Sequence, residues 1–259
     1  MLVDSHCHLN MLDLTPFDND LANVIQAAAD NDVQQMLCVS VDLKTLPDVM
    51  HCAERFDNVY ASVGVHPNDS KDEAPSVDEL VALASKPKVV AIGETGLDYF
   101  RSEGDLQWQR DAFRTHIRAA IKANKPVIIH TRDAREDTLK IMAEENIQQV
   151  GGVMHCFTET WEMAEAAMEM GFYISFSGIV TFKNAKELQE VAQKTPLERM
   201  LVETDSPYLA PVPFRGKPNY PAYVRNVAEF IADLRGDSVG KIAEATTKNF
   251  HELFKINEV

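Results

Sequence analysis

Short apolar runs recur along the chain and alternate with segments in which apolar residues stand three and four apart. The first pattern predicts buried strands, and the second predicts amphipathic helices, for example over residues 18–31, 107–124 and 184–194. The predicted strands are LVDSH from Leu2, QQMLCVS from Gln34, VYASVGV from Val59, VVAIGE from Val89, PVIIH from Pro126, GGVMHC from Gly151, FYISFS from Phe172 and RMLVET from Arg199.

Apolar strands that alternate with amphipathic helices are typical of a parallel sheet covered by helices. Successive strands begin roughly 20 to 37 residues apart, which is the spacing of βα units. Eight such units in 259 residues predict a TIM (β/α)8 barrel, with one domain over residues 1–259. Residues 209–221 (LAPVPFRGKPNYP) are expected to form a long loop. A further helix is predicted over residues 238–256, with core positions Val239, Ile242, Ala243, Phe250 and Phe254.

Composition places the chain among globular proteins, because 45% of its residues are hydrophobic and 25% are charged. There is no stretch of about 18 apolar residues and no basic segment followed by an apolar one at the start. We therefore expect neither a membrane span nor a secretory signal, and a cytoplasmic location. The four cysteines form no CxxC pair, which favours reduced thiols over a disulfide framework or a thiolate zinc site.

Histidines and carboxylates stand where the predicted strands end, and in a barrel of this type those ends form the rim that carries the active site. His6 and His8 are two residues apart, so in an extended strand they point to the same side. Cys7 and Cys156 adjoin such positions with the opposite parity and are expected to be small buried residues. The other rim residues are His66, Glu94, His130, His155 and Asp205.

Imidazoles and carboxylates that converge on one rim are typical metal ligands. A single zinc ion with an open position uses three protein ligands, so a larger set predicts two divalent metal ions. Glu94 lies between the early and the late ligands in strand order and is the candidate bridge. Zinc, manganese, cobalt, iron and magnesium remain open as the metal. The predicted ligands are His6, His8, Glu94, His130, His155 and Asp205.

The motifs DSHCHL, GVHP, GETGLDY, HTRDA, HCFT, YISFSG and ETDSPYL together resemble those of the TatD-like metal-dependent deoxyribonucleases. The resemblance covers almost the whole chain, through PFRGKPN and TTKNFHELF, and points to a bacterial subgroup. It implies a TIM barrel that hydrolyses phosphodiester bonds in DNA, usually as a 3′-to-5′ exonuclease. It also implies that Asp205 positions the attacking water. The implied ligand sets are His6, His8, Glu94 and Asp205 for one metal ion, and Glu94, His130 and His155 for the other.

Three more residues near the predicted rim are candidates for contact with substrate. His66 of GVHP either contacts the substrate, supports a metal ligand, or is a loop histidine ordered by Pro67. Arg132 either neutralises charge on the phosphoryl group or pairs with a carboxylate such as Asp133. Glu203 either orients a ligand histidine, contacts a substrate hydroxyl, or forms a buried hydrogen bond.

The net charge limits how DNA could be held. With 40 acidic and 25 basic residues, the formal charge of −15 opposes long-range attraction to a polyanion. We therefore expect DNA to be gripped locally, as a single strand, a 3′ end or a short oligonucleotide, with weak salt dependence. Aromatic and basic residues at 99–101 and 214–217 could stack a base and hold a phosphate, although packing within loops is the alternative.

Two other functions fit parts of the same pattern. A metal-dependent amidohydrolase or phosphotriesterase acting on a small molecule would use the same barrel and ligand layout. Many such sites are bridged by a carboxylated lysine on the fourth strand, where this chain has Glu94. A non-catalytic metal-binding scaffold is the second alternative, and the full ligand set speaks against it.

Overall fold

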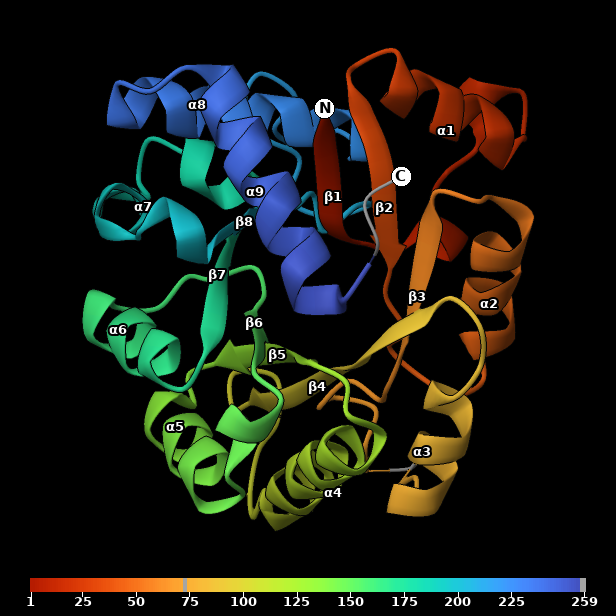
Figure 1. Cartoon of the computed structure of the whole chain (residues 1–259), viewed down its shortest axis with the longest axis vertical. Helices are drawn as coiled ribbons and strands as arrows, with labels where there is room; N and C mark the ends of the chain where they lie inside the picture. The colour runs from red at the N-terminus through yellow and green to blue at the C-terminus, as the bar shows by residue number, and fades with distance from the viewer. Residues whose placement is uncertain (72–73, 257–259) are drawn as a thin grey trace.

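The computed structural model describes residues 1–71 and 74–256. Eight parallel strands pair in the order of the sequence, and this arrangement confirms the predicted TIM barrel (Figure 1). The strands are β1 (Leu2–Cys7), β2 (Val33–Cys38), β3 (Val59–Val63), β4 (Val89–Asp98), β5 (Val127–Arg132), β6 (Gly152–Met154), β7 (Phe172–Phe176) and β8 (Met200–Val202).

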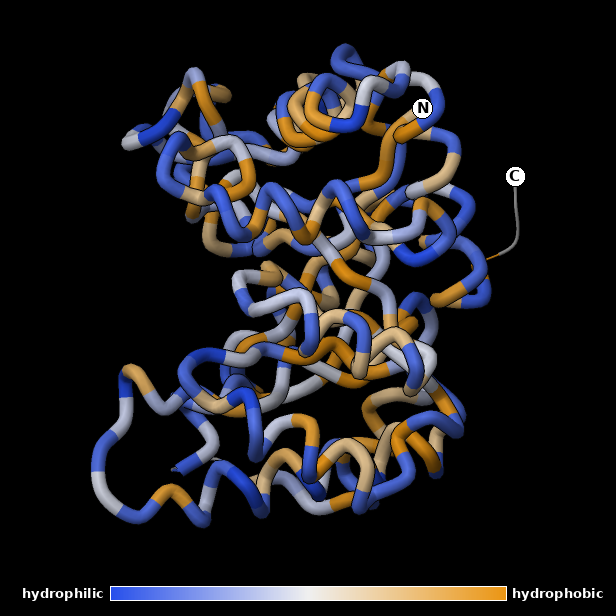
Figure 2. The backbone as a smooth tube through the Cα atoms, turned by 90° about the vertical axis from the view of Figure 1, so that its left-hand side faces the viewer, coloured by the Kyte–Doolittle hydropathy of each residue, from blue (hydrophilic) through white to orange (hydrophobic). Residues whose placement is uncertain are grey.

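Helices surround the barrel, and along the chain hydrophobic and hydrophilic segments alternate at short intervals, as amphipathic helices require (Figure 2). No helix within the described residues is long and apolar enough to cross a lipid bilayer. The α-helices are α1 (Leu21–Ala29), α2 (Leu46–Arg55), α3 (Val77–Ala84), α4 (Gln107–Ala123), α5 (Arg135–Glu144), α6 (Trp161–Glu169), α7 (Lys186–Lys194), α8 (Val224–Arg235) and α9 (Val239–Phe254). Short 3-10 helices are Leu9–Met11, Thr15–Phe17, Ile147–Gln149, Gly178–Thr181, Leu197–Arg199 and Pro221–Tyr223.

The barrel closes between β1 and the chain that follows β8. The backbone N–H of Asp205 donates to the carbonyl of His6 (2.9 Å). The buried carboxylate of Asp4 accepts from both the backbone N–H (2.8 Å) and the hydroxyl (2.5 Å) of Thr204. Burial outweighs these hydrogen bonds and raises the pKa of Asp4 to about 8. The first and last strands are thus joined beside two of the predicted metal ligands.

One end of the barrel is filled by α9, which lies across the strands in Figure 1. Its Phe250, Leu253 and Phe254 pack in one apolar cluster with residues such as Val3 and Ile128 inside the barrel. Most of the core positions predicted for this helix are confirmed as buried, and Val239 is partly buried against the same core. The helix therefore closes the end of the barrel opposite the predicted rim. The predicted loop at 209–221 is also confirmed, apart from the short helix that starts at Pro221.

Strand β4 continues four residues beyond the predicted run and reaches Asp98. Its Gly96 has a φ of +136°, and a Cβ at that position would lie 2.0 Å from the carbonyl oxygen of His130. Only glycine permits so close an approach of β4 to β5. This approach places the end of β4 beside His130 and extends the rim of the pocket.

Candidate metal centre

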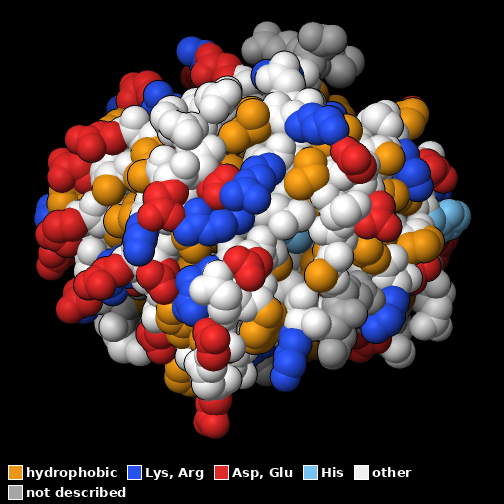
Figure 3. All heavy atoms as spheres, turned by 90° about the horizontal axis from the view of Figure 1, so that it is seen from below, with side chains coloured by type: hydrophobic (Ala, Val, Ile, Leu, Met, Phe, Trp, Pro, Cys, Tyr) orange, Lys and Arg blue, Asp and Glu red, His pale blue; other side chains and the backbone are white. Residues whose placement is uncertain are grey.

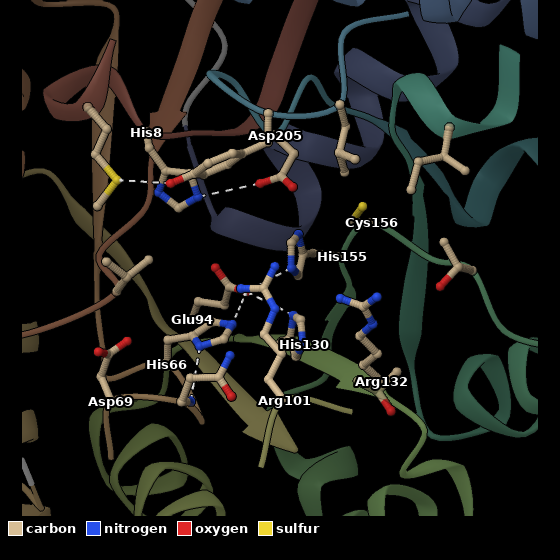
Figure 4. Close-up of a pocket in the computed structure, with 18 residues that line it drawn as sticks. His8, His66, Asp69, Glu94, Arg101, His130, Arg132, His155, Cys156 and Asp205 are labelled. Atoms are coloured by element: carbon tan, nitrogen blue, oxygen red, sulfur yellow. Dashed lines mark hydrogen bonds and ion pairs between the residues drawn. The ribbon is translucent and has the colours of Figure 1, made fainter. Parts of the chain in front are cut away.

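The six predicted ligands converge at the carboxyl end of the barrel. His6 and His130 lie within β1 and β5, Glu94 lies in the middle of β4, and His8 directly follows β1. His155 comes directly after β6, and Asp205 three residues after the end of β8. All of them except His6 line a pocket of about 680 Å3 (Figure 4). Strands far apart in sequence therefore deliver these side chains to one place.

Glu94 occupies the centre of the site, and its side chain is only 4% exposed. One carboxylate oxygen, Oε2, lies 3.4 Å from Nε2 of His6. The other, Oε1, lies 2.9 Å from Nε2 of His155, 3.2 Å from Nδ1 of His130 and 3.5 Å from Nε2 of His66. One oxygen thus faces His6 and the other faces three further imidazoles, which is the arrangement that a bridging carboxylate needs.

Asp205 completes the side of the site formed by β1. Its Oδ1 lies 3.4 Å from Nε2 of His8 and 3.7 Å from Nε2 of His6. The backbone of Asp205 has a φ of 56°, a left-handed conformation that aspartate adopts more readily than most residues. Burial alone would raise the pKa of Asp205, but the hydrogen bond from His8 and the nearby histidine charges keep it below its usual range. The carboxylate is therefore ionised at neutral pH.

Three of the candidate ligand histidines also make a contact on the side of the ring that faces away from the pocket. In each, the ring nitrogen that points away from Glu94 or Asp205 contacts an oxygen atom of a neighbouring strand or loop. Such contacts fix the orientation of metal-binding imidazoles. The pairs are His8 Nδ1 with the carbonyl of Val39 (2.9 Å), His130 Nε2 with Asp98 Oδ2 (3.2 Å) and His155 Nδ1 with Glu203 Oε1 (3.2 Å).

The donor set fits divalent metal ions. Both ring nitrogens of His6 and Nε2 of His155 are buried and make no hydrogen bond of good geometry within the described residues, although both Nε2 atoms lie close to the Glu94 carboxylate. Buried polar atoms left in this state are costly, and a metal ion would satisfy them. Among the described residues, three sets of side chains each bring one potential ligand atom per residue within 4.8 Å of the others in the set. The sets are His6, His155 and Glu203; His6, His8 and Asp205; and His66, Glu94 and His130.

The electrostatics of the pocket also favour a cation. Burial would lower the pKa of His155, but Glu94 and Glu203 hold it well above its usual range. Burial would likewise raise the pKa of Glu94, but the surrounding histidines, His155 foremost, hold it well below. In the protein alone, a proton on His155 supplies the positive charge that these carboxylates stabilise. Metal ions and protons would therefore compete for this site.

His66 and Arg132, the predicted substrate contacts, both line the pocket. His66 lies three residues beyond β3, and burial lowers its pKa to about 4, so the ring is neutral. The guanidinium carbon of Arg132 lies 3.9 Å from the centre of the Phe100 ring. Within the described residues this stack, rather than a pair with Asp133, is the contact that positions Arg132.

Glu203 lies behind His155 and is fully buried. Its Oε1 also accepts the backbone N–H of Cys156 at 2.7 Å. Opposite strand parity predicted that Cys156 is buried and points away from the site. This prediction is wrong, because Cys156 is only partly buried and lines the pocket. Its backbone φ of 43° breaks the strand parity on which the expectation rested. Cys7 is fully buried, as expected.

The two aromatic and basic stretches differ in their surroundings. Phe100 is 61% exposed, and Arg101 lines the pocket (Figure 4). Tyr99 is not part of that lining, and its hydroxyl donates to Asp137 at 2.6 Å. In the other stretch, Phe214 stacks on Tyr223 with ring centres 4.0 Å apart. The aromatic ring of residues 214–217 therefore packs against the short helix Pro221–Tyr223.

Sequence reasoning missed two residues of the site. Asp98 orients His130, and its place two residues after Gly96 and four after Glu94 on one extended strand would have indicated it. Tyr208 lines the pocket and is 54% exposed. Its place three residues after Asp205 in ETDSPY was the only signal, since no periodic pattern extends into this loop.

Comparisons with known proteins agree with this site. The model of the family described as TatD related DNase matches residues 3–255. YcfH of Escherichia coli strain K12, described as an uncharacterized metal-dependent hydrolase, is 51% identical in an alignment of 259 positions that covers 99% of this chain and 96% of YcfH. The 3′-5′ ssDNA/RNA exonuclease TatD of Shigella flexneri is 34% identical, with 93% of this chain and 95% of that protein covered.

Among solved structures, the crystal structure of YJJV, a TatD homologue from Escherichia coli K12, superposes with a TM-score of 0.89 at 28% identity. The superposition covers 99% of this chain and 98% of that one. Fold, ligand cluster and sequence matches all agree over nearly the full length. The chain therefore belongs to the TatD-related DNase family and is a metal-dependent hydrolase.

Proposed function

We propose that this chain hydrolyses phosphodiester bonds in DNA, removing nucleotides from the 3′ end of a single strand or a short oligonucleotide. The observation that carries the proposal is the position of Glu94, whose two oxygens face different histidines below a rim that holds Arg101 and Arg132. The name of the Shigella relative, a 3′-5′ ssDNA/RNA exonuclease, supports the same reaction.

The ligand set suits two divalent ions of zinc, manganese, cobalt, iron or magnesium, because it mixes imidazole nitrogens with carboxylate oxygens. When bound, such a pair supplies an activated water and neutralises charge on the phosphoryl group. The residues that would hold them are His6, His8, Asp205 and Glu94 on one side, and Glu94, His130 and His155 on the other.

Asp205 is the group placed to take the proton from the attacking water. Its carboxylate is ionised, lines the pocket and is 13% exposed, so a water molecule can reach it. In the reaction the water oxygen bonds to phosphorus, and the bond from phosphorus to the 3′ oxygen breaks. One water proton passes to Asp205, and the departing 3′ oxygen takes up a proton from solvent.

The rim of the pocket suits a nucleotide at a chain end. Arg132 and Arg101 supply guanidinium groups for a phosphate. Phe100 and Tyr208 are among the few large apolar side chains that are exposed, and exposed aromatic rings are platforms for unpaired bases. Because base stacking needs an unpaired end, we propose single-stranded ends rather than intact duplex as the substrate.

The experiment is product mapping on oligonucleotides labelled at the 5′ end, single-stranded and duplex, with protein of measured metal content. We expect a ladder that shortens one nucleotide at a time from the 3′ end of the single strand, and no such ladder with metal-free protein. The alternative of an amidohydrolase or phosphotriesterase is tested with cyclic amides and phosphotriesters in the same assay. Turnover of those compounds, with intact oligonucleotides, would overturn the proposal.

A further inference from the structure

Four histidines of the site make a hydrogen bond that reveals which ring nitrogen carries the proton. In His8, His130 and His155, the nitrogen on the far side of the ring contacts a carbonyl or carboxylate oxygen. Such an oxygen only accepts, so the far nitrogen carries a proton. The near nitrogens of His130 and His155 also face Glu94, and any proton there is the one that a metal ion would displace. In the neutral ring the near nitrogen then has a free lone pair, which is the form a metal ligand requires.

His66 has the opposite arrangement. The backbone N–H of Asn68 donates to Nδ1 of His66 at 3.1 Å. A backbone N–H can only donate, so Nδ1 is unprotonated and the proton of the neutral ring is on Nε2. That Nε2 is the nitrogen that faces the site, 3.5 Å from Oε1 of Glu94. A nitrogen that carries a proton has no lone pair to give to a metal ion.

We propose that His66 is a fixed hydrogen-bond donor to a phosphoryl oxygen of the substrate, and not a metal ligand. The proposal rests on the proposed function, since it assigns a contact to the phosphate that is cleaved. Distance alone would group His66 with Glu94 and His130 as a possible metal site. The polarity of the hydrogen bond to Asn68 separates His66 from that group.

The surroundings of His66 hold its ring in place. Its backbone N–H donates to the carbonyl of Val41 at 2.8 Å. The Asn68 side chain donates to Oδ2 of Asp98 at 3.3 Å, and the same carboxylate oxygen contacts His130. The rings of His66 and His130 meet edge to face with centres 4.6 Å apart. One network therefore positions both the donor histidine and a metal ligand.

A donor at this point has a chemical purpose. The predicted ligands present carboxylate oxygens and nitrogen lone pairs, which repel the oxygens of a phosphate that no cation screens. A neutral N–H directed into the pocket attracts such an oxygen, and because it is already oriented it needs no reorganisation when substrate binds. The side chain of His66 is 13% exposed, so the contact is shielded from bulk water while substrate can reach it.

The first test is 15N NMR of zinc-loaded protein labelled in its histidine rings, which distinguishes protonated from unprotonated ring nitrogens. We expect one histidine with unprotonated Nδ1 and protonated Nε2 to disappear in His66→Gln while the zinc-bound rings remain. The exposed His51 provides the assignment control through His51→Gln. A zinc-bound Nε2 at His66, or a proton on its Nδ1, would overturn the proposal.

The second test compares metal content and the affinity for inorganic phosphate in His66→Leu and His66→Gln. We expect both variants to keep the metal content of the unchanged protein. Phosphate affinity should fall about tenfold in His66→Leu, the size of one hydrogen bond to a charged group, and should be largely restored by the amide N–H of His66→Gln. Loss of a metal ion in His66→Gln, or equal phosphate affinity in all three proteins, would refute the assignment.

These tests separate the two proposals. If the protein cleaves no oligonucleotide, the proposed function fails, but ring protonation and phosphate affinity still decide the role of His66. If oligonucleotides are cleaved and His66→Leu retains both full phosphate affinity and full kcat/KM, only the role of His66 fails. Should His66→Leu not fold, the NMR spectrum of the unchanged protein and the Gln variant give the answer.

Discussion

The two ends of the barrel are built from opposite kinds of residue. At the amino end, Phe250, Leu253 and Phe254 of α9 fill the interior and are each at most 8% exposed. At the carboxyl end, the interior opens into a pocket lined by histidines, carboxylates and arginines (Figure 4). The same strands contribute to both ends, so residues a few positions apart in sequence serve different purposes.

The polar atoms of the two ends differ in the same way. At the closed end, Nε2 of His251 pairs with Oε1 of Gln35 at 2.6 Å, and the Asn249 amide donates to the carbonyls of Leu197 and Met200. At the open end, buried nitrogens of His6 and His155 face the Glu94 carboxylate without making a hydrogen bond of good geometry within the described residues. A satisfied end adds to folding stability, whereas an unsatisfied end keeps binding capacity for a ligand. This contrast predicts that stability and activity can be damaged separately.

The largest effect on activity is expected from Asp205→Asn. The amide keeps the size of the side chain but cannot accept the proton of the attacking water and loses the charge that binds a cation. We expect kcat on a single-stranded oligonucleotide to fall about 10³-fold, within the range for loss of a general base. The urea midpoint of the metal-free protein at pH 7 should fall slightly, because the hydrogen bond from His8 and the nearby histidine charges outweigh burial, so the ionised carboxylate stabilises the fold.

Asp133→Asn is the matched control for that variant. Asp133 is also an aspartate in the left-handed conformation after a barrel strand, but its side chain is exposed. We expect its activity to match that of the unchanged protein. If Asp205→Asn retained full activity at equal metal content, Asp205 would have no part in proton transfer.

The opposite effect is expected at the closed end, from Phe250→Ala. Phe250 is fully buried beneath the barrel, and its truncation should lower the free energy of unfolding by about 3 to 5 kcal/mol. Urea unfolding measures this loss. At urea concentrations below the unfolding transition, kcat should stay within about twofold of the unchanged value, since the site lies at the other end. A large fall in kcat of folded Phe250→Ala would show that the two ends are coupled.

Phe100→Ala, at the open rim, should lower the free energy of unfolding by only about 0.5 to 1 kcal/mol through its lost stack with Arg132, while KM for oligonucleotides rises.

A histidine outside the site, His116 of α4, is expected to affect stability and not catalysis. Its Nε2 accepts the backbone N–H of Val65 at 3.0 Å, and burial lowers its pKa to about 4. Because the unfolded chain takes up a proton near pH 6.5 and the folded protein does not, stability is full above that pH. It is lost as pH falls towards 4.

Lowering the pH from 7.5 to 5 should therefore decrease the free energy of unfolding by about 2 kcal/mol through His116. The measurement is urea unfolding at both pH values for the unchanged protein and for His116→Gln, whose side-chain oxygen can still accept the Val65 N–H. The difference between the two pH dependences isolates this histidine from all other groups. Equal pH dependence in both proteins would mean that His116 is protonated in the folded state.

The sequence predicted the barrel and the convergence of the six candidate ligands, because both follow from short-range patterns. Apolar runs define strands, and in a parallel barrel the ends of all strands meet, so His6 and Asp205 could be brought together without knowing any distance. The structure was needed where the backbone leaves the strand pattern. The left-handed conformation of Cys156 reverses the parity assigned to it, and the continuation of β4 past Glu94 brings Asp98 into the site. Tyr208 depends on a loop path that no periodicity encodes.

The smallest effect is expected from salt, and it tests whether DNA is held only at the open end. On the face of the molecule seen in Figure 3, basic side chains lie among acidic ones. Many are already paired, for example Arg118 with Glu145 at 2.7 Å and Lys122 with Asp78 at 2.6 Å. The formal charge of −15 also opposes the binding of phosphates beyond the rim.

Raising NaCl from 50 to 200 mM at saturating metal should therefore lower kcat/KM on a single-stranded oligonucleotide by less than about tenfold, as two phosphate contacts would give. Proteins that bind six to ten phosphates lose about 10³ to 10⁵ in affinity over the same interval. Arg132→Gln should flatten the dependence further, because it removes one of the two arginines at the rim. A hundredfold loss for the unchanged protein would mean that DNA also follows a surface outside the pocket. Binding of substrate would then not be confined to the open end of the barrel.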